Sequence, residues 1–206
     1  MEYEIDLLMR LVSVDTTSTI RKNFEEVADL LVYEARKASL IAKRVVDDKG
    51  IPHVIIKIPK APKKSRKIIF LTHYDVVPAG EDWDFDPFKP FIKDGKLYGR
   101  GAADSKSNIA AAIAAFKEVL EEGLPIKINP VLVIIGGEES GEGTSFYNKL
   151  EGNVCVVLDS GCYGLSVGAS GVVSLIIKVF GRQAHSAYPF LGKTPYMIRK
   201  NNFIHR

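Results

Sequence analysis

Three continuous apolar runs alternate with two helix-length segments, and this alternation most constrains the fold of the chain. The runs lie at 67–72, 131–135 and 154–158, and each has the length of a buried strand. An Ala-rich segment at 106–122 and a shorter one at 143–150 separate them. Continuous apolar strands are typical of sheets that are covered on both faces. The order therefore predicts an α/β fold, with a largely parallel sheet and helices on both faces.

The N-terminal part adds two helices and two further strands to this core. Apolar residues recur at helical spacing over 2–13 and 23–38, and strands are expected near 40–46 and 53–58. The pair Asp94-Gly95, between two short apolar stretches, predicts a tight hairpin.

A change in the pattern of apolar and polar residues near residue 171 predicts a domain boundary. Residues 1–170 carry the strand and helix alternation, and we expect them to form one domain. The segment at 171–182 has the composition of one long strand, and the last residues show no clear periodicity. We therefore expect 171–206 to be the beginning of a second, incomplete domain.

Histidine and carboxylate side chains follow the ends of the predicted strands. They are His73 and Asp75 after the first run, Glu138 and Glu139 after the second, Asp159 after the third, and Asp104 before the Ala-rich helix. In an open parallel sheet the carboxyl ends of the strands share one rim, where ligands bind. So many carboxylates would repel one another unless a cation lay among them. The sequence thus predicts a divalent metal site on this rim.

The donor types and their spacing indicate which chemistry such a site performs. Imidazole and carboxylate together suit zinc, cobalt or manganese. His73 and Asp75 are two residues apart, so in an extended backbone both point to one side and the carboxylate can hold the second ring nitrogen. Of the adjacent Glu138 and Glu139, one can bind metal while the other holds an activated water. This combination predicts a metal-dependent hydrolase.

Each of these residues also has an ordinary structural interpretation when it is considered alone. A strand-end histidine is commonly just hydrogen-bonded, Asp104 could cap the following helix, and Asp159 could begin a turn. The glutamate pair could form a solvated turn. The occurrence of all of them at successive strand ends favours the metal site.

Composition argues against several classes of partner. The formal net charge of +3 is too small for a nucleic-acid-binding surface, and no aromatic residues interleave the basic stretch at 60–67. The acidic N-terminus differs from a signal peptide, and no apolar stretch reaches the length of a membrane span. Cys155, inside an apolar run, is expected to be buried, and together with Cys162 it forms no pattern of disulfides. We expect a cytoplasmic protein with no nucleic-acid or membrane partner.

Several ordered motifs resemble the M20 family of metallopeptidases and deacylases, which includes acetylornithine deacetylases, succinyl-diaminopimelate desuccinylases and aminoacylases. The motifs are HYDVVP at 73–78, DGKLYGRGAADSK at 94–106, GEESG at 137–141 and GRQAHS at 181–186. The resemblance implies a zinc-exopeptidase-like catalytic domain with a smaller lid or dimerisation domain inserted in it. It also implies hydrolysis of an amide bond in an N-acyl amino acid or a small peptide.

The resemblance further implies a role for each residue of the rim. His73 and Asp159 would hold one divalent metal ion and Glu139 a second, with Asp104 bridging the two. The ions would be zinc, with cobalt or manganese as alternatives.

The remaining roles concern protons and orientation. Glu138 would act as general base on the bridging water, and Asp75 would orient the histidine ligand. His185 would be the lid-domain histidine that polarises the scissile carbonyl, in many members within the partner subunit's site, which allows for a homodimer.

In one respect the sequence departs from the family pattern. Family members take a final histidine ligand for the second metal from a segment well beyond the lid domain. Here His205 is the only histidine after His185, and it lies too early to match that ligand. We therefore expect the 206-residue chain alone to be a poor catalyst. Two rivals stay open: a truncated remnant that binds metal or associates through its exposed lid strand, and a two-metal phosphoesterase.

Overall fold

The computed structural model describes residues 2–159, 164, 166–168, 171, 173, 175–178 and 180–193. They fall into two compact units, Met1–Tyr163 and Gly164–Arg206, and each unit is described by itself. The division lies a few residues before the domain boundary expected at residue 170, and the assignment of a catalytic and a lid domain stays a prediction.

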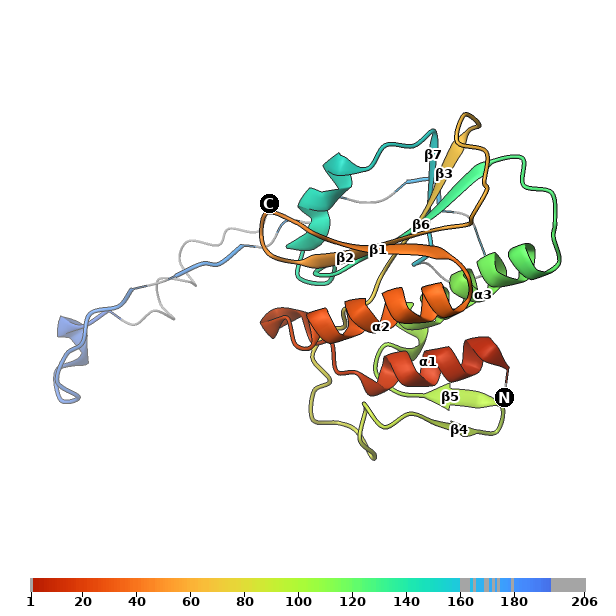
Figure 1. Cartoon of the computed structure of the whole chain (residues 1–206). Helices are drawn as coiled ribbons and strands as arrows, with labels where there is room; N and C mark the ends of the chain where they lie inside the picture. Colours follow the sequence, from red (N-terminus) through yellow and green to blue (C-terminus); the bar gives the residue numbers. More distant parts are fainter. Residues whose placement is uncertain are drawn as a thin grey trace. The chain divides into compact units, whose positions relative to one another are not determined.

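A five-stranded sheet forms the centre of the first unit, in the order β1-β2-β6-β3-β7 (Figure 1). Its strands are β1 (Ile41–Val46), β2 (Pro52–Lys57), β3 (Lys67–His73), β6 (Asn129–Ile135) and β7 (Val154–Val157). The three apolar runs of the sequence are β3, β6 and β7, and β3 pairs in parallel with both of the others. The predicted parallel core is therefore present. On the far side of β6, β2 and β1 add two antiparallel pairings, so the sheet is mixed.

The helices cover the two faces of this sheet unequally. The three long helices α1 (Tyr3–Ser13), α2 (Phe24–Lys37) and α3 (Ser107–Glu121) lie on one face (Figure 1). The 3-10 helix η3 (Gly143–Lys149) covers the other face. Along β6, Leu132 and Ile134 belong to the core on the α-helical face, whereas Val131 and Val133 pack in a second cluster with Phe146 of η3. This double coverage explains why the strand is apolar from Pro130 to Ile135.

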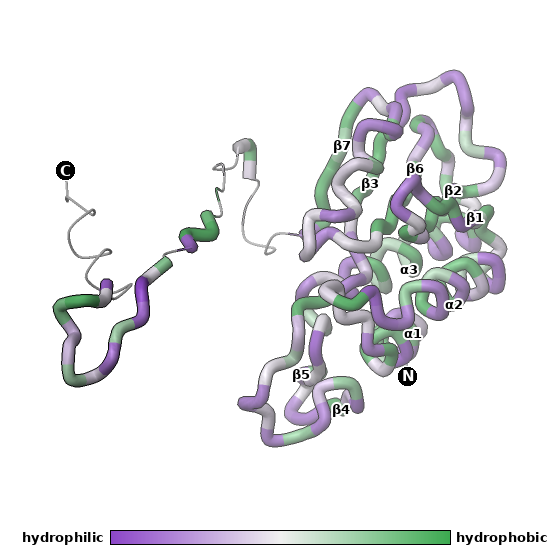
Figure 2. The backbone as a smooth tube through the Cα atoms, turned by 90° about the vertical axis from the view of Figure 1, so that its left-hand side faces the viewer, coloured by the Kyte–Doolittle hydropathy of each residue, from purple (hydrophilic) through white to green (hydrophobic). Residues whose placement is uncertain are grey.

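The helical spacing of apolar residues predicted the positions of α1 and α2 correctly. Leu7, Leu8 and Leu11 of α1 are buried, as are Val27 and Leu31 of α2. Figure 2 shows hydrophilic and hydrophobic residues interspersed along both helices. Burying one stripe of each helix against the sheet supplies most of the hydrophobic stabilisation of this layer.

The predicted hairpin is confirmed between β4 (Phe91–Lys93) and β5 (Lys96–Tyr98). Asp94 and Gly95 both have positive φ, 51° and 71°. This is the conformation that a two-residue hairpin loop needs, and it explains the Asp-Gly pair.

Strand β7 corrects one expectation from the sequence. Cys155 was expected to be buried, but it is exposed, as are Val154 and Val157. Among the described residues β7 pairs only with β3, so it is an edge strand and one side of it lacks a neighbour. The apolar composition of the run predicted the strand correctly but not its place in the sheet.

The described part of the second unit corrects another expectation. The long strand predicted over 171–182 is absent from the residues described there, apart from one bridge between Arg182 and Lys193. Val173 and Ile176 are 81% and 88% exposed, so no neighbouring strand covers the side chains of these two described residues. The unit also holds the short 3-10 helix η4 (Pro189–Leu191). Cys162, His205 and the C-terminal stretch lie outside the described residues.

Two short segments complete the first unit, and its surface charge is mixed. They are the 3-10 turn η1 (Ser18–Ile20) and the π-helical turn η2 (Ala102–Lys106), which leads into α3.

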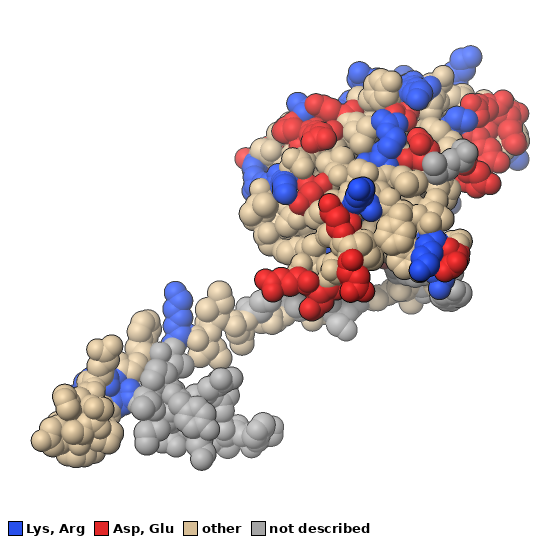
Figure 3. Space-filling model, turned by 90° about the horizontal axis from the view of Figure 1, so that it is seen from below, with Lys and Arg blue, Asp and Glu red and all other residues tan. Residues whose placement is uncertain are grey.

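Figure 3 shows lysine and arginine side chains interspersed with acidic ones on the face drawn. Within the described residues, every helix is too short or too polar to cross a membrane.

Candidate metal centre

The carboxyl ends of the parallel strands bring the predicted residues to one rim. His73 is the last residue of β3, and Asp159 follows the end of β7 by two residues. Glu138 and Glu139 come just after β6, and Asp104 lies in η2. Ligands bind at this rim of an open sheet. The residues therefore lie where the order of the strands predicts them.

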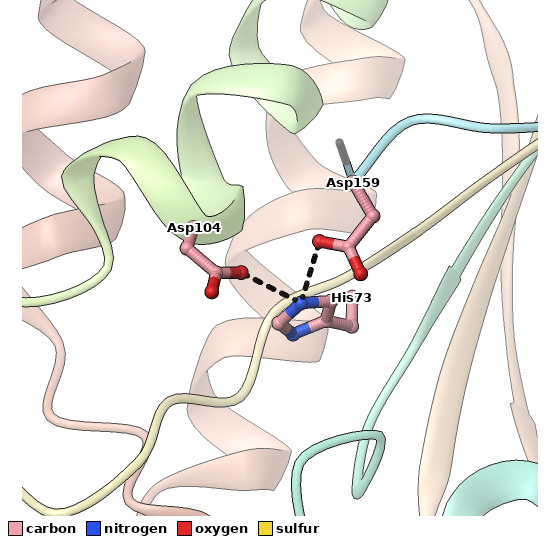
Figure 4. Close-up of side chains that lie close together, drawn as sticks. All are labelled: His73, Asp104 and Asp159. Atoms are coloured by element: carbon pink, nitrogen blue, oxygen red, sulfur yellow. Dashed lines mark hydrogen bonds and ion pairs between the residues drawn. The ribbon is translucent and has the colours of Figure 1, made fainter. Parts of the chain in front are cut away.

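Three of these side chains converge on one point (Figure 4). The Nε2 atom of His73 lies 3.2 Å from Oδ1 of Asp104 and 3.2 Å from Oδ1 of Asp159. One ligand atom from each residue lies within 4.8 Å of the others. The His73 side chain is only 2% exposed, whereas that of Asp104 is 69% exposed. One buried imidazole nitrogen and two carboxylate oxygens of exposed residues form a donor set that fits a zinc-like cation.

A hydroxyl pair under the rim holds Asp104 against His73. Thr72 Oγ1 and Ser105 Oγ are 2.6 Å apart, and Ser105 Oγ donates a hydrogen bond to the backbone oxygen of His73 at 3.2 Å. Both hydroxyls are buried. They tie η2 to the end of β3, and the peptide bond between Asp104 and Ser105 is cis.

Helix α3 holds the segment that leads to Asp159. The side-chain amide of Asn108 donates to the backbone oxygen of Leu158 at 2.9 Å. The backbone N–H of Leu158 donates to Leu71 of β3 at 2.7 Å. The position of the Asp159 carboxylate therefore depends on both the helix and the sheet.

Asp75 is fully buried and joins the end of β3 to the glutamate loop. The Nδ1–H of His73 donates to the backbone oxygen of Asp75 at 3.0 Å, while the Asp75 carboxylate lies 3.6 Å from Nδ1. The two carboxylate oxygens instead accept the backbone N–H groups of Glu138 and Glu139, each at 3.0 Å. Asp75 thus contacts His73 as the spacing predicts, but mainly through its backbone oxygen. The Asp75 carboxylate instead holds the backbone of both glutamates, a contact that the sequence spacing did not predict.

The charges of the rim perturb the histidine strongly. Burial lowers the pKa of His73, but the hydrogen bond and charge of Asp75, together with the charges of Asp159 and Glu138, outweigh it and raise the pKa to about 10. The surrounding carboxylates therefore favour positive charge at Nε2, and a divalent ion bound there would replace the proton.

Different neighbouring charges shift the pKa values of the two glutamates. Burial raises the pKa of both carboxyl groups. For Glu139 the largest charge effect comes from Asp104, which raises its pKa further. For Glu138 the largest charge effects come from His73, which lowers the pKa, and Asp159, which raises it. Asp104 and Glu139 also line one cavity of about 160 Å³, next to Arg100.

His185 belongs to the second unit and is exposed. Its Nδ1 accepts the backbone N–H of Ala187 at 3.2 Å. Because that unit is described by itself, the role implied for His185 at the rim stays a prediction.

Sequence reasoning missed the residues that hold the ligands in place. Ser105 and Asn108 had no signal of their own, because serine and asparagine near a helix start are common. The sequence indicated Lys106 only as the last residue of the motif at 94–106 and predicted no structural role for it. It is fully buried, and its ammonium group donates to the backbone oxygens of Leu11 and Val14 at the end of α1.

Comparison with known protein families matches residues 69–178 to Peptidase family M20/M25/M40. The match spans more than half of the 206 residues and contains every ligand candidate on the rim. The chain belongs to Peptidase family M20/M25/M40. The resemblance noted from the motifs is thereby confirmed.

Among curated proteins, this M20 family member is similar to two bacterial succinyl-diaminopimelate desuccinylases. It is 30% identical to that of Sulfurovum sp. (strain NBC37-1), over 93% of this chain and 52% of the relative. It is 33% identical to that of Wolbachia pipientis wMel, over 89% of this chain and 46% of the relative. The chain thus spans about half the length of the curated relatives that it matches.

Solved structures confirm the α/β fold of this M20 family member. The M20 family metallo-carboxypeptidase Sso-CP2 from Sulfolobus solfataricus superposes with a TM-score of 0.70 and 26% identity, over 78% of this chain and 38% of that chain. Aminopeptidase PepT from Bacillus cereus superposes with a TM-score of 0.63 and 24% identity, over 96% of this chain and 54% of that chain.

Proposed function

We propose that this chain carries the metal site of an amide hydrolase that acts on an N-acyl amino acid or a small peptide. The observation that carries the proposal is the convergence of His73, Asp104 and Asp159 on one point, beside two anchored glutamates. Membership of a peptidase family and similarity to desuccinylases and a metallo-carboxypeptidase support the substrate class.

The donor set supports a proposal for the residues that would hold metal. His73 and Asp159 would bind one divalent ion, and Glu139 would bind a second across the cavity that it shares with Asp104. Asp104 would bridge the two. Zinc suits these donors, with cobalt or manganese as alternatives. When bound, such ions polarise a carbonyl group and lower the pKa of water.

The chain's own residues would move the proton. Glu138 would accept a proton from the attacking water and deliver it to the leaving amine, which balances the hydrolysis of the amide bond. Its raised pKa, caused first by burial, suits a group that must hold a proton between the two steps. Asp75 would keep the loop of Glu138 fixed through the two backbone hydrogen bonds. His185 would polarise the carbonyl, and a homodimer would bring it to a partner's site.

A substrate panel tests this function directly. Zinc-loaded chain is incubated with N-succinyl and N-acetyl amino acids, dipeptides and phosphate monoesters, alongside the variant Glu138→Gln. We expect slow release of amino acid from the amide substrates only, with the rate lowered about a thousandfold or more in the variant, the upper range for loss of a general base. Hydrolysis of phosphate esters instead would overturn the proposal in favour of a phosphoesterase. Tight zinc binding without any turnover would favour the metal-binding remnant.

A further inference from the structure

The loop that carries the two glutamates is held from behind as well as from the rim. It runs through residues 136–142 between β6 and η3. On its rear side lies the turn between β1 and β2. Lys49 of that turn donates from Nζ to the backbone oxygen of Glu142 at 2.7 Å, and Arg21 contacts both the turn and the Glu142 side chain. Two segments distant in sequence thus form one support.

His53 of β2 makes the most buried contact of this support. Its side chain is 0% exposed, and Nδ1 accepts the backbone N–H of Gly136 at 3.3 Å. Its ring stacks on Phe146 of η3 with centroids 4.0 Å apart and planes 13° apart. Gly136 is the first residue after β6, two positions before Glu138. The imidazole therefore fixes the point from which the glutamate loop departs.

The other ring nitrogen lies beside a carboxylate. Nε2 is 3.3 Å from Oδ2 of Asp47 but is not aligned for a hydrogen bond to it, whereas Oδ1 of Asp47 accepts the backbone N–H groups of Lys49 and Ile51. Since Nδ1 accepts a hydrogen bond, the hydrogen of a neutral ring is on Nε2. Burial lowers the pKa of His53 more than Asp47 raises it, which favours the neutral ring.

The space around Gly136 leaves the loop little freedom. A Cβ atom on Gly136 would lie 2.1 Å from the hydroxyl of Tyr74, which itself donates to the backbone oxygen of Pro52 at 2.6 Å. A Cβ atom on Gly143 would lie 1.9 Å from the backbone oxygen of Gly136. A buried N–H that lost its acceptor here would be left unpaired, which costs free energy.

We propose that His53 is a positioning residue that sets the places of Glu138 and Glu139 by accepting the hydrogen bond of Gly136. It touches neither substrate nor metal, and acts through the backbone of the loop. The consequence for metal binding rests on the proposed function, whereas the consequence for the loop itself does not.

Two complementary variants separate the acceptor from the packing. His53→Phe keeps an aromatic ring to stack on Phe146 but removes the acceptor. His53→Asn keeps an acceptor at the position of Nδ1 but removes the ring. Val54→Ala, on the same strand and facing the opposite core, is the matched control for general loss of stability.

The primary readout is amide hydrogen exchange of the metal-free protein. In His53→Phe we expect the N–H groups of Gly136, Glu138 and Glu139 to exchange about tenfold faster relative to the centre of β6, because the loop loses its anchor. His53→Asn should restore these rates to within about threefold, and Val54→Ala should leave the ratio unchanged. Equal ratios in His53→Phe and Val54→Ala would overturn the proposal and make His53 a core residue only.

Zinc titration of the same proteins tests the consequence for the site. We expect about tenfold weaker zinc binding in His53→Phe and recovery in His53→Asn, the size usual for residues that orient ligands. If the wild-type chain binds no zinc, the proposed function fails, and the exchange ratios still decide the positioning role.

Discussion

At the scale of single residues, Asp75 has the largest number of roles on the rim. Its backbone oxygen accepts from His73, and its carboxylate accepts from Glu138 and Glu139. It therefore joins the residues expected to hold the first ion to those expected to hold the second ion and the catalytic proton.

Asp75→Asn is predicted to loosen this junction while the protein still folds. The amide supplies one acceptor but turns its NH₂ group toward a backbone N–H, which leaves one buried donor unpaired. We expect a loss of about 1–3 kcal/mol in the free energy of unfolding, measured with urea. Zinc affinity should fall about 10–100-fold. The exposed substitution Asp82→Asn is the control, and an equal effect there would contradict the assignment.

The raised pKa of His73 leads to a prediction about pH. Its folded-state pKa of about 10 exceeds the unfolded value of about 6.5, so the ring stabilises the metal-free fold fully below pH 6.5. That contribution is lost as pH rises through 10. At pH 8 zinc must displace the proton of this ring, so its affinity should increase with pH up to about 10.

Calorimetry in buffers of different ionisation enthalpy measures this proton release. We expect close to one proton per zinc at pH 8, released from His73. Zinc binding without any proton release at pH 8 would show that His73 does not enter the site.

At the scale of elements, Lys106 links η2 to the end of α1, a contact that the sequence did not predict. Its buried side-chain nitrogen donates to the last carbonyl groups of α1 from the end of η2, and burial lowers the pKa of Lys106 to about 7. Helix ends leave such carbonyl groups without partners, so these two hydrogen bonds satisfy them.

Lys106→Met is predicted to weaken this connection with little change in side-chain volume. Two backbone oxygens lose their donor, and we expect a loss of about 2–4 kcal/mol in the free energy of unfolding. Thermal and urea unfolding measure it, with Lys37→Met, at an exposed position of α2, as the control. A stability within 0.5 kcal/mol of wild type, roughly the spread of neutral surface changes, would contradict the role.

The elements themselves were largely predictable, and the exceptions have physical causes. Period and apolar runs predicted α1, α2, α3 and the parallel strands because each buries a defined face. The antiparallel pairing of β2 with β6 was not predictable, because strand order depends on contacts between segments far apart in sequence. The expected strand at 171–182 was wrong for the residues described, because apolar composition alone does not supply a pairing partner.

At the scale of the whole molecule, the first unit is a five-stranded sheet, covered on both faces, with a rim of acidic residues. That the ligand candidates lie on this rim was predictable from sequence, because they follow strand ends. Ser105, Asn108 and His53 were not predictable, because their roles are hydrogen bonds to backbone atoms that only the fold brings near. The second unit carries His185, whose role stays a prediction.

The measurement that tests the central claim most directly is zinc binding by the purified 206-residue chain, compared between His73→Ala and His185→Ala. We predict at least one tightly bound zinc ion per chain, lost in His73→Ala and retained in His185→Ala, with any second ion bound more weakly. A wild-type chain without tightly bound zinc, or equal binding in His73→Ala, would contradict the metal site on this rim.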